Sequence, residues 1–323
     1  MPSATQTVVI TGGNAGLGDA CARAIAQAQA GWLIVIASRD ERRGADAAAR
    51  LNAAAGGSVA QALTLDLASL RSVRNFAGQL ASRELPPLHA LVCNAGLQIV
   101  SGVSQSEDGF ETTFAVNHLG HCELIRLLLE QLVAPARIVL VSSGTHDPAQ
   151  RTGMPAPQLT DAQALASPEQ QAGPDGTSAA TAGRRRYTTS KLCNVLTTYE
   201  LARRLQAAGR GEEITVNAFD PGLMPDSGLA RDYRPMQRVA YRLLAPALRL
   251  MPGVNSVAGS GRALARLVLD PDLAGVSGTY FSGTKQVRSS AESYDEEKAH
   301  RLWEQSEELI ASAGRAGPSP KES

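Results

Sequence analysis

The sequence has no excess of charge of either sign and no long apolar run. Lys plus Arg and Asp plus Glu each total 31 in 323 residues. This balance argues against a nucleic-acid-binding protein, because such proteins need a basic excess to replace the counterions of the phosphates. No uncharged apolar stretch reaches 18 residues, so we expect no membrane span.

Closely spaced cysteines are also absent. The four cysteines lie far apart and form no CxxC pair: Cys21, Cys93, Cys122 and Cys193. The sequence therefore predicts neither a disulfide scaffold nor a zinc site, and we expect no bound metal. The first residues lead into an apolar strand without a basic region, so we expect no signal peptide. Together these absences predict a cytoplasmic protein in a reducing compartment.

Apolar residues make up 43% of the chain and charged residues only 19%, a composition that can form a sizeable core. Seven short apolar runs predict strands, with helical stretches between most of them: 8–10, 33–37, 62–65, 90–93, 137–141, 215–219 and 278–281. Continuous apolar runs are typical of parallel strands that are buried on both faces. The alternation predicts a doubly wound, Rossmann-type α/β sheet with helices on both faces, in a single domain spanning residues 1–323.

Two segments depart from this alternation. Residues 144–186 contain five Gly, five Pro and nine Ala, and we interpret them as an insertion that forms a lid or a disordered loop. Near the C-terminus, apolar residues at helical spacing predict a helix over residues 290–314. Ser293 and Glu296 are spaced as a capping box, which predicts where that helix begins.

A glycine-rich turn follows the first predicted strand. Thr11 is followed by Gly12, Gly13, Asn14, Ala15, Gly16, Leu17 and Gly18, and then by an Ala-rich helical run. Glycines let the backbone approach a pyrophosphate, and the helix N-terminus supplies free N–H groups. The strand–turn–helix context favours a dinucleotide site over the alternative, a tight turn without a ligand.

The end of the second predicted strand indicates which dinucleotide would bind. An acidic residue there would bind the ribose hydroxyls of NAD, but the sequence has Ser38 followed by Arg39. A guanidinium suits a 2′-phosphate. We therefore expect NADP (NADPH), although Arg39 could instead be a solvated residue at a helix start.

Tyr187 and Lys191 are spaced four residues apart, so they share one face of a helix. The chain contains only four Lys and six Tyr. A nearby ammonium favours the phenolate, which lowers the pKa of a tyrosine towards the range useful for acid–base chemistry. A surface Tyr–Lys pair is the alternative. However, Ser142 and Ser143 end a predicted strand at the carboxyl edge of the sheet, where such sheets bind ligands.

With these motifs the sequence resembles the short-chain dehydrogenase/reductase family. The matching residues occur in family order from residue 5 to about residue 285: Thr11-Gly12-xxx-Gly16-x-Gly18, Asp66-Leu67, Asn94-Ala95-Gly96, Asn117, Ser143, Tyr187-xxx-Lys191 and Asp220-Pro221-Gly222. The resemblance implies an oxidoreductase that transfers a hydride between NAD(P) and a carbonyl or alcohol.

The resemblance also implies roles for these residues. Tyr187 would donate the proton, Lys191 would bind the nicotinamide ribose, Ser143 would bind the substrate oxygen, and Asn117 would hold a relay water. The resemblance implies further cofactor contacts at Asp66, Leu67, Asn94, Ala95, Gly96, Pro221, Gly222 and Ser227. Ser227 would replace a threonine that the family usually has near the nicotinamide.

Within the family, Val116–His121 and Ser190–Asn194 resemble retinol dehydrogenases and light-dependent protochlorophyllide reductases. The C-terminal stretch 297–310 and the long insertion resemble the second group. That group has a Cys after Pro-Gly, where this chain has Leu223. The leading hypothesis is therefore an NADP-dependent carbonyl reductase or alcohol dehydrogenase. The alternatives are a protochlorophyllide-reductase-like photoenzyme and an NADP-binding sensor without turnover.

The substrate is expected to be a small carbonyl or alcohol compound. Residues 233–252 are rich in apolar side chains, which favours a lipophilic substrate wall, an ordinary packed helix or a reversible membrane-surface contact. Arg184, Arg185 and Arg186 could neutralise an anionic substrate or be solvated. The sequence leaves open whether the chain forms a homo-oligomer.

Overall fold

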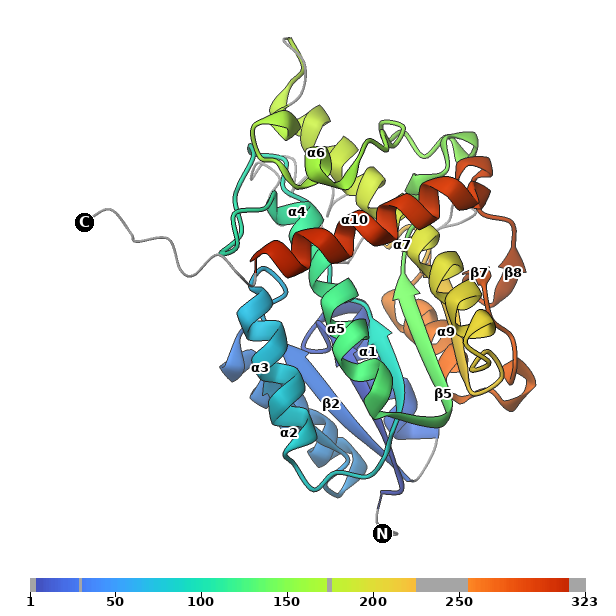
Figure 1. The fold of residues 1–323 in the computed structure, drawn as a ribbon. Helices are drawn as coiled ribbons and strands as arrows, with labels where there is room; N and C mark the ends of the chain where they lie inside the picture. Colours follow the sequence, from blue (N-terminus) through green and yellow to red (C-terminus); the bar gives the residue numbers. More distant parts are fainter. Residues whose placement is uncertain (1–3, 29–30, 173–175, 225–254, 314–323) are drawn as a thin grey trace.

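A computed structural model describes residues 4–28, 31–172, 176–224 and 255–313, and strands alternate with helices along most of this length (Figure 1). The strands are β1 (Gln6–Thr11), β2 (Trp32–Ser38), β3 (Ala60–Thr64), β4 (Leu88–Cys93), β5 (Leu132–Val141), β6 (Ile214–Asp220), β7 (Thr279–Ser282) and β8 (Lys285–Val287). The helices are α1 (Gly16–Ala28), α2 (Glu41–Ala55), α3 (Leu70–Ala81), α4 (Thr112–Phe114), α5 (Gly120–Leu128), α6 (Ala162–Ala166), α7 (Ala179–Ala207), α9 (Val257–Leu269) and α10 (Glu296–Ala313).

The described strands form one sheet in the order β3-β2-β1-β4-β5-β6-β7-β8. The first seven in this order pair in parallel, so the predicted doubly wound sheet is confirmed. The prediction of seven strands was wrong by one, because β8 pairs antiparallel with β7 at the sheet edge. All three residues of β8 are exposed, and such a short exposed strand has no apolar run that a sequence could reveal.

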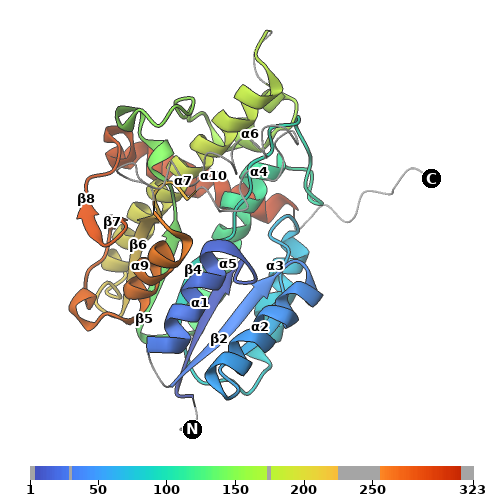
Figure 2. The same ribbon diagram turned by 180° about the vertical axis from the view of Figure 1, so that it is seen from behind.

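Alternate residues of the central strands point to opposite faces of the sheet. Val8 and Ile10 pack with α1, α2 and α9, whereas Val9 packs with α3, α5 and α7. Figures 1 and 2 show these two helical layers from opposite sides. Fully burying an aliphatic side chain contributes about 1.5–3 kcal/mol, so strands that are apolar on both faces stabilise both layers.

The insertion predicted over residues 144–186 is shorter than expected. Its last eight residues form the first turns of α7, which begins at Ala179. The described part before α7 includes α6, and Leu165 of α6 is buried in a cluster with Leu192 of α7 and Leu302 of α10. The described residues of the insertion therefore do not form a disordered loop. That the insertion acts as a lid stays a prediction.

The C-terminal helix is confirmed but begins later than predicted. A 3-10 turn covers Ala291–Tyr294, and α10 begins at Glu296. The side chain of Asp295, rather than that of Ser293, accepts a hydrogen bond from the N–H of Lys298 at 3.0 Å. The Ser293 hydroxyl donates instead to the carbonyl of Ser290. As Figure 1 shows, α10 crosses α7 and α5.

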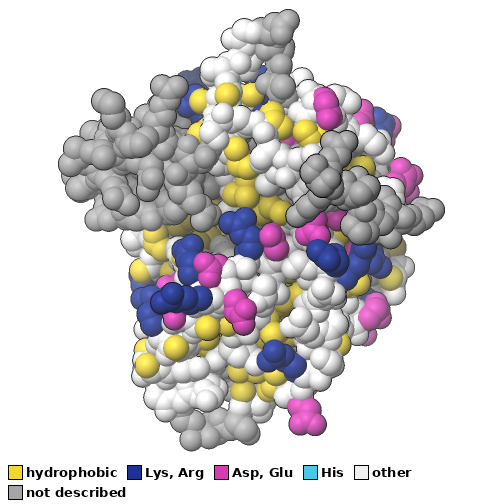
Figure 3. Space-filling view, turned by 90° about the vertical axis from the view of Figure 1, so that its left-hand side faces the viewer, with side chains coloured by type: hydrophobic (Ala, Val, Ile, Leu, Met, Phe, Trp, Pro, Cys, Tyr) yellow, Lys and Arg dark blue, Asp and Glu magenta, His cyan; other side chains and the backbone are white. Residues whose placement is uncertain are grey.

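The described surface agrees with the balanced charge of the chain. Figure 3 shows one face on which basic and acidic side chains are interspersed rather than gathered into a patch of one sign. Within the described ranges, no helix combines the length and apolar character needed to cross a bilayer. The same residues contain no cluster of three or more His, Cys, Asp or Glu side chains that could hold a metal ion.

Candidate active site

The predicted site residues lie along the carboxyl edge of the sheet. Ser38 ends β2, Thr11 ends β1, Asn94 follows β4, and Ser143 lies two residues beyond β5. These four strands are consecutive in the sheet. Strands lie about 4.8 Å apart, so the ends of β2 and β5 are separated by roughly 14 Å. An extended ligand can therefore contact all four strand ends at once.

The glycine-rich turn has a backbone shape that other residues adopt poorly. Gly12 and Gly16 have φ angles of 64° and 59°. A Cβ atom on Gly18 would lie 2.6 Å from Nδ2 of Asn94, whereas a Cβ on Gly16 would have no neighbour within 4 Å. The turn is therefore packed against the end of β4 on one side and open at the N-terminus of α1. Asn14 is partly exposed, and Leu17 is buried.

Thr11 connects this turn to β4 and α5. Its hydroxyl oxygen accepts hydrogen bonds from the N–H groups of Asn94 and Ala95, both at 2.9 Å. The same oxygen lies 2.9 Å from Nε2 of His121, whose Nδ1 lies 3.3 Å from the carbonyl oxygen of Asn117. Because a carbonyl can only accept, Nδ1 carries the proton. Nε2 of His121 and the carbonyl oxygen of Val92, which lies 3.3 Å from the Thr11 hydroxyl, are then the two acceptors for the single hydroxyl proton. His121 had no predicted role beyond its place in the stretch Val116–His121, yet it bridges the predicted cofactor turn and Asn117.

Ser38 and Arg39 differ in exposure although they are adjacent. Ser38 is buried, and its hydroxyl donates to the carbonyl of Asp40 at 3.0 Å. Arg39 is exposed, and no ion pair joins it to an acidic residue in the described part of the chain. The Asp40 carboxylate caps α2 by accepting from the N–H of Arg43. The Arg39 guanidinium therefore faces solvent, where a ligand phosphate can reach it.

Tyr187 and Lys191 lie on α7 and are both buried. The Lys191 Nζ atom lies 5.5 Å from the centroid of the Tyr187 ring and donates to the carbonyl of Val141 at 2.9 Å. Burial lowers the pKa of Lys191 to about 8, and the nearby Asp220 carboxylate opposes that shift. At neutral pH the amine is therefore mostly protonated. It places a positive charge 5.5 Å from the centre of the Tyr187 ring.

The two serines at the end of β5 have different contacts. The Ser142 hydroxyl donates to the carbonyl of Lys191 at 2.8 Å and so attaches β5 to α7. Ser143 is only partly buried, and its oxygen accepts from the N–H of Thr145 at 3.3 Å. The turn Gly144–His146 that follows packs against α7. These contacts make Ser142 a structural residue and leave Ser143 as the serine that can reach a ligand.

Asn117 lies in a π-helical turn, Ala115–Leu119, just before α5. Its side chain accepts from the N–H of Leu97 and donates to the Leu97 carbonyl, both at 2.9 Å, and also donates to Ser190 Oγ at 3.0 Å. A Cβ atom on Gly96 would lie 3.4 Å from Asn117 Oδ1 and 3.5 Å from Lys191 Nζ. The structure thus brings Asn117, Gly96 and Lys191 together.

The remaining predicted contacts lie at the edges of this region. Asp66 follows β3 and accepts from the N–H of Ala68, while Leu67 is buried against Gly120. Gly222 donates its N–H to Asp220 Oδ1 at 2.9 Å, and Pro221 lies between them. Ser227 and the predicted substrate wall at 233–252 lie outside the described residues.

Arg186 does not serve the role suggested for the arginine run. It is buried, and its Nε atom lies 3.3 Å from Oε1 of the buried Glu111. Its other guanidinium nitrogens donate to the carbonyls of Gln171, Ile99 and Gly102. Because Glu111 neutralises its charge and three carbonyls accept from its terminal nitrogens, the buried Arg186 is not free to bind an anionic substrate.

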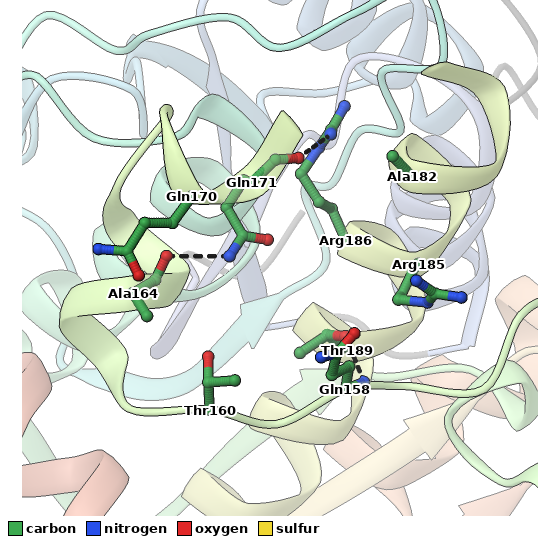
Figure 4. A pocket seen from close by; sticks show the side chains of 9 residues that line it. All are labelled: Gln158, Thr160, Ala164, Gln170, Gln171, Ala182, Arg185, Arg186 and Thr189. Carbon is green, nitrogen blue, oxygen red and sulfur yellow. Dashed lines mark hydrogen bonds between the residues drawn. The ribbon is translucent and has the colours of Figure 1, made fainter. Parts of the chain in front are cut away.

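A pocket of about 150 Å³ lies beside α7, but it is distinct from the predicted site (Figure 4). Its lining comes from α6, the residues around it and the first half of α7: Gln158, Thr160, Ala164, Gln170, Gln171, Ala182, Arg185, Arg186 and Thr189. None of the predicted catalytic or cofactor-binding residues lines it. Thr189 is two residues from Tyr187 and so points to nearly the opposite side of the helix.

Two buried histidines make folding sensitive to acid. Burial lowers the pKa of His118 to about 3 and that of His121 to about 4, whereas an unfolded histidine titrates near 6.5. Below that pH the unfolded chain binds more protons than the folded chain. The two histidines therefore do not lower the unfolding free energy above about pH 6.5. They lower it progressively as the pH falls from there towards the folded pKa values. We expect the unfolding free energy to be lower at pH 5.5 than at pH 7 by about 2–3 kcal/mol for the pair.

Urea unfolding at the two pH values measures this difference. His118→Gln should reduce it by about half of the contribution of the pair, whereas His89→Asn, which changes a partly exposed histidine, should reduce it much less. An unfolding free energy that is equal at both pH values would contradict the prediction.

The residues present fit a dinucleotide. The turn at Gly12–Gly18 leaves open space at the N-terminus of a 13-residue helix, where N–H groups and the helix dipole favour a phosphate. Arg39 offers an exposed cation at one end of the row of strand ends, and Tyr187 and Lys191 lie at the other end. The fold and the site therefore define a dinucleotide-binding α/β protein of the Rossmann type.

Comparison with known proteins identifies the family to which the chain belongs. Residues 6–153 match the family model described as short chain dehydrogenase. The chain is 36% identical to the WW domain-containing oxidoreductase of Gallus gallus, over 97% of this chain and 70% of that protein. It is 37% identical to protochlorophyllide reductase A of Oryza sativa subsp. japonica, over 94% of this chain and 80% of that protein. The chain belongs to the short-chain dehydrogenase/reductase family of NAD(P)-dependent oxidoreductases.

Solved structures show the same fold. A protein of unknown function from Mycobacterium Paratuberculosis is similar with a TM-score of 0.67 and 28% identity, over 95% of this chain and 94% of that one. The Pseudomonas aeruginosa RhlG/NADP active-site complex is similar with a TM-score of 0.60 and 25% identity, over 86% of this chain and 94% of that one.

Proposed function

We propose that the protein is an NADPH-dependent reductase of a small, lipophilic carbonyl compound, or the corresponding alcohol dehydrogenase. The observation that carries this proposal is the buried Lys191 ammonium beside the Tyr187 ring, on a helix that packs against the turn after Ser143. In this proposal Tyr187 is the acid–base group and Ser143 the hydroxyl donor, both at the carboxyl edge of the sheet. In this proposal the chain acts as one domain.

The cofactor would lie along the row of strand ends. Gly12, Asn14, Gly16, Leu17 and Gly18 would surround the pyrophosphate, and Arg39 with Ser38 would bind the 2′-phosphate. Asp66 and Leu67 would flank the adenine, and Asn94–Gly96 with Pro221 and Gly222 would line the nicotinamide side. The similarity to a structure solved as an NADP complex supports this choice of cofactor.

The reaction needs a hydride and a proton, and a reduced nicotinamide held by the glycine-rich turn and Lys191 would supply the hydride. Ser143 donates a hydrogen bond to the carbonyl oxygen and holds it in place. Tyr187 donates its phenolic proton to that oxygen as negative charge develops there. The Lys191 ammonium stabilises the resulting phenolate, and Asn117 positions the loop after β4 that faces Lys191.

The test is a panel of aldehydes and ketones of increasing apolar size, each incubated with NADPH while the absorbance of the reduced nicotinamide is followed. We expect turnover that increases with apolar character, and oxidation of the matching alcohols with NADP. Tight NADPH binding without turnover of any substrate would contradict the proposal and favour a sensor.

A second candidate is a light-dependent reductase. The observation that favours it is the 37% identity to a protochlorophyllide reductase over most of both chains. Against it stands Leu223, at the position where the resemblance places a cysteine. Turnover that requires illumination would favour this candidate, and equal rates in light and darkness would exclude it.

A further inference from the structure

His146 is a buried histidine at the candidate active site, and it lies outside the residues on which the family resemblance rests. It ends the 3-10 turn Gly144–His146 directly after Ser143 and has no exposed surface. Its ring packs against that of Tyr280 on β7, with the centroids 5.1 Å apart. A polar ring in such a position must satisfy both nitrogens within the protein.

The partners of the two ring nitrogens fix its protonation state. Nδ1 lies 2.6 Å from the carbonyl oxygen of Ser143, and Nε2 lies 3.1 Å from the backbone nitrogen of Ser290. A carbonyl can only accept and an N–H can only donate, so Nδ1 carries the proton and Nε2 is the acceptor. The imidazole is therefore neutral. Burial, which lowers the pKa of His146, agrees with this state even though the carboxylates of Asp147 and Asp220 oppose the shift.

These two hydrogen bonds connect residues that are far apart in the sequence. Ser143 has an extended backbone, with φ −169° and ψ 146°, and its side chain caps the turn that contains His146. Ser290 precedes the turn Ala291–Tyr294 that leads into α10, and α10 packs on α7. The peptide that carries the Ser143 hydroxyl is thus attached through one imidazole to the segment before the C-terminal helix.

We propose that His146 is a positioning residue for Ser143. The Ser143 carbonyl accepts from the backbone N–H of His146 at 3.1 Å and from Nδ1. The donation from Nδ1, which alone depends on the side chain, fixes the peptide so that the Ser143 hydroxyl points towards the substrate oxygen. Ser290 fixes the imidazole in the tautomer that can donate. This inference rests on the proposed function of Ser143, and it adds a residue on which the geometry of that hydroxyl depends.

Two substitutions separate the two hydrogen bonds. In His146→Asn, the side-chain amide nitrogen can occupy the Nδ1 position and keep the donor to Ser143 while losing the contact with Ser290. In His146→Gln, the amide oxygen can occupy the Nε2 position and keep the acceptor for Ser290 while losing the donor. A purely structural role predicts similar effects for both, because each variant keeps one of the two hydrogen bonds.

We expect His146→Gln to lower kcat by roughly 10–100-fold, the range expected when a reacting group is misplaced, and His146→Asn to recover most of that loss. The affinity for NADPH, measured by fluorescence titration, should not change in either variant. In a Ser143→Ala background the His146 substitutions should have almost no further effect on kcat, because the hydroxyl that they position is gone. Equal kcat values for the Asn and Gln variants, or full additivity with Ser143→Ala, would overturn the proposal.

The unsubstituted protein provides an independent measurement. The ¹⁵N chemical shifts of the imidazole, assigned by comparison with His146→Gln, should show a neutral ring protonated at Nδ1. A cationic ring at neutral pH, or a proton on Nε2, would overturn the proposal without any assay of activity. If the unsubstituted protein reduces no carbonyl compound, the proposed function fails, whereas normal turnover with an Nε2–H tautomer would reject only the role of His146.

Discussion

Replacing Tyr187 by Phe should nearly abolish turnover while leaving NADPH binding intact. The substitution removes only the phenolic oxygen, and the ring can keep its place 5.5 Å from Lys191 Nζ. Without that oxygen no group on α7 delivers the proton as charge develops on the substrate oxygen. Loss of general acid catalysis costs roughly 10²–10⁴-fold. The measurement is kcat with the best substrate of the carbonyl panel, together with the dissociation constant for NADPH.

Thr188→Val is the matched control for this experiment. It removes a hydroxyl from the adjacent, equally buried position on α7, where the only hydrogen bond of the side chain in the described structure is to the carbonyl of Arg185. We expect kcat within a few-fold of the unsubstituted value for this variant. A Tyr187→Phe protein that retains similar activity would remove Tyr187 from the mechanism.

Replacing Arg39 by Ala should change the choice of cofactor. The exposed guanidinium can form charge-assisted hydrogen bonds with a 2′-phosphate, worth about 1.5–3 kcal/mol. At about 1.4 kcal/mol per factor of ten, Arg39→Ala should weaken NADPH binding roughly 10–150-fold and hardly affect NADH. Ser38→Asp should shift the preference further, because a carboxylate favours the ribose hydroxyls and repels the phosphate.

The ratio of kcat/KM for NADPH to that for NADH measures this effect in each variant. Arg50→Ala is the control, because it removes a charge of the same kind from the last turns of α2, more than two helical turns from Arg39. Because Ser38 is buried, the thermal unfolding of Ser38→Asp should be measured together with its activity, to show that this variant folds. A protein that prefers NADH, or a ratio that neither substitution changes, would contradict the role of Arg39. The assignment of Tyr187 and Lys191 would survive that result, because they lie at the other end of the row of strand ends.

The sequence by itself determined the features that depend on neighbouring residues. Continuous apolar runs predicted parallel strands, because a strand covered on both faces needs apolar residues at every position. The glycines of the first turn reflect a local backbone shape, and the four-residue spacing of Tyr187 and Lys191 puts them on one helix face wherever that helix lies. The order of these motifs along the chain was enough to identify the family.

Only the tertiary structure decided which distant residues meet. Ala179–Arg186 has no apolar periodicity, yet it is helical because Gly183 lets the helix pack against the backbone of Ile99, and Arg186 binds Glu111. The partner of His146 Nε2 is the N–H of Ser290, 144 residues further along the chain. Such contacts leave no local pattern, since the partners of a buried polar group are fixed by how the helices and strands pack together.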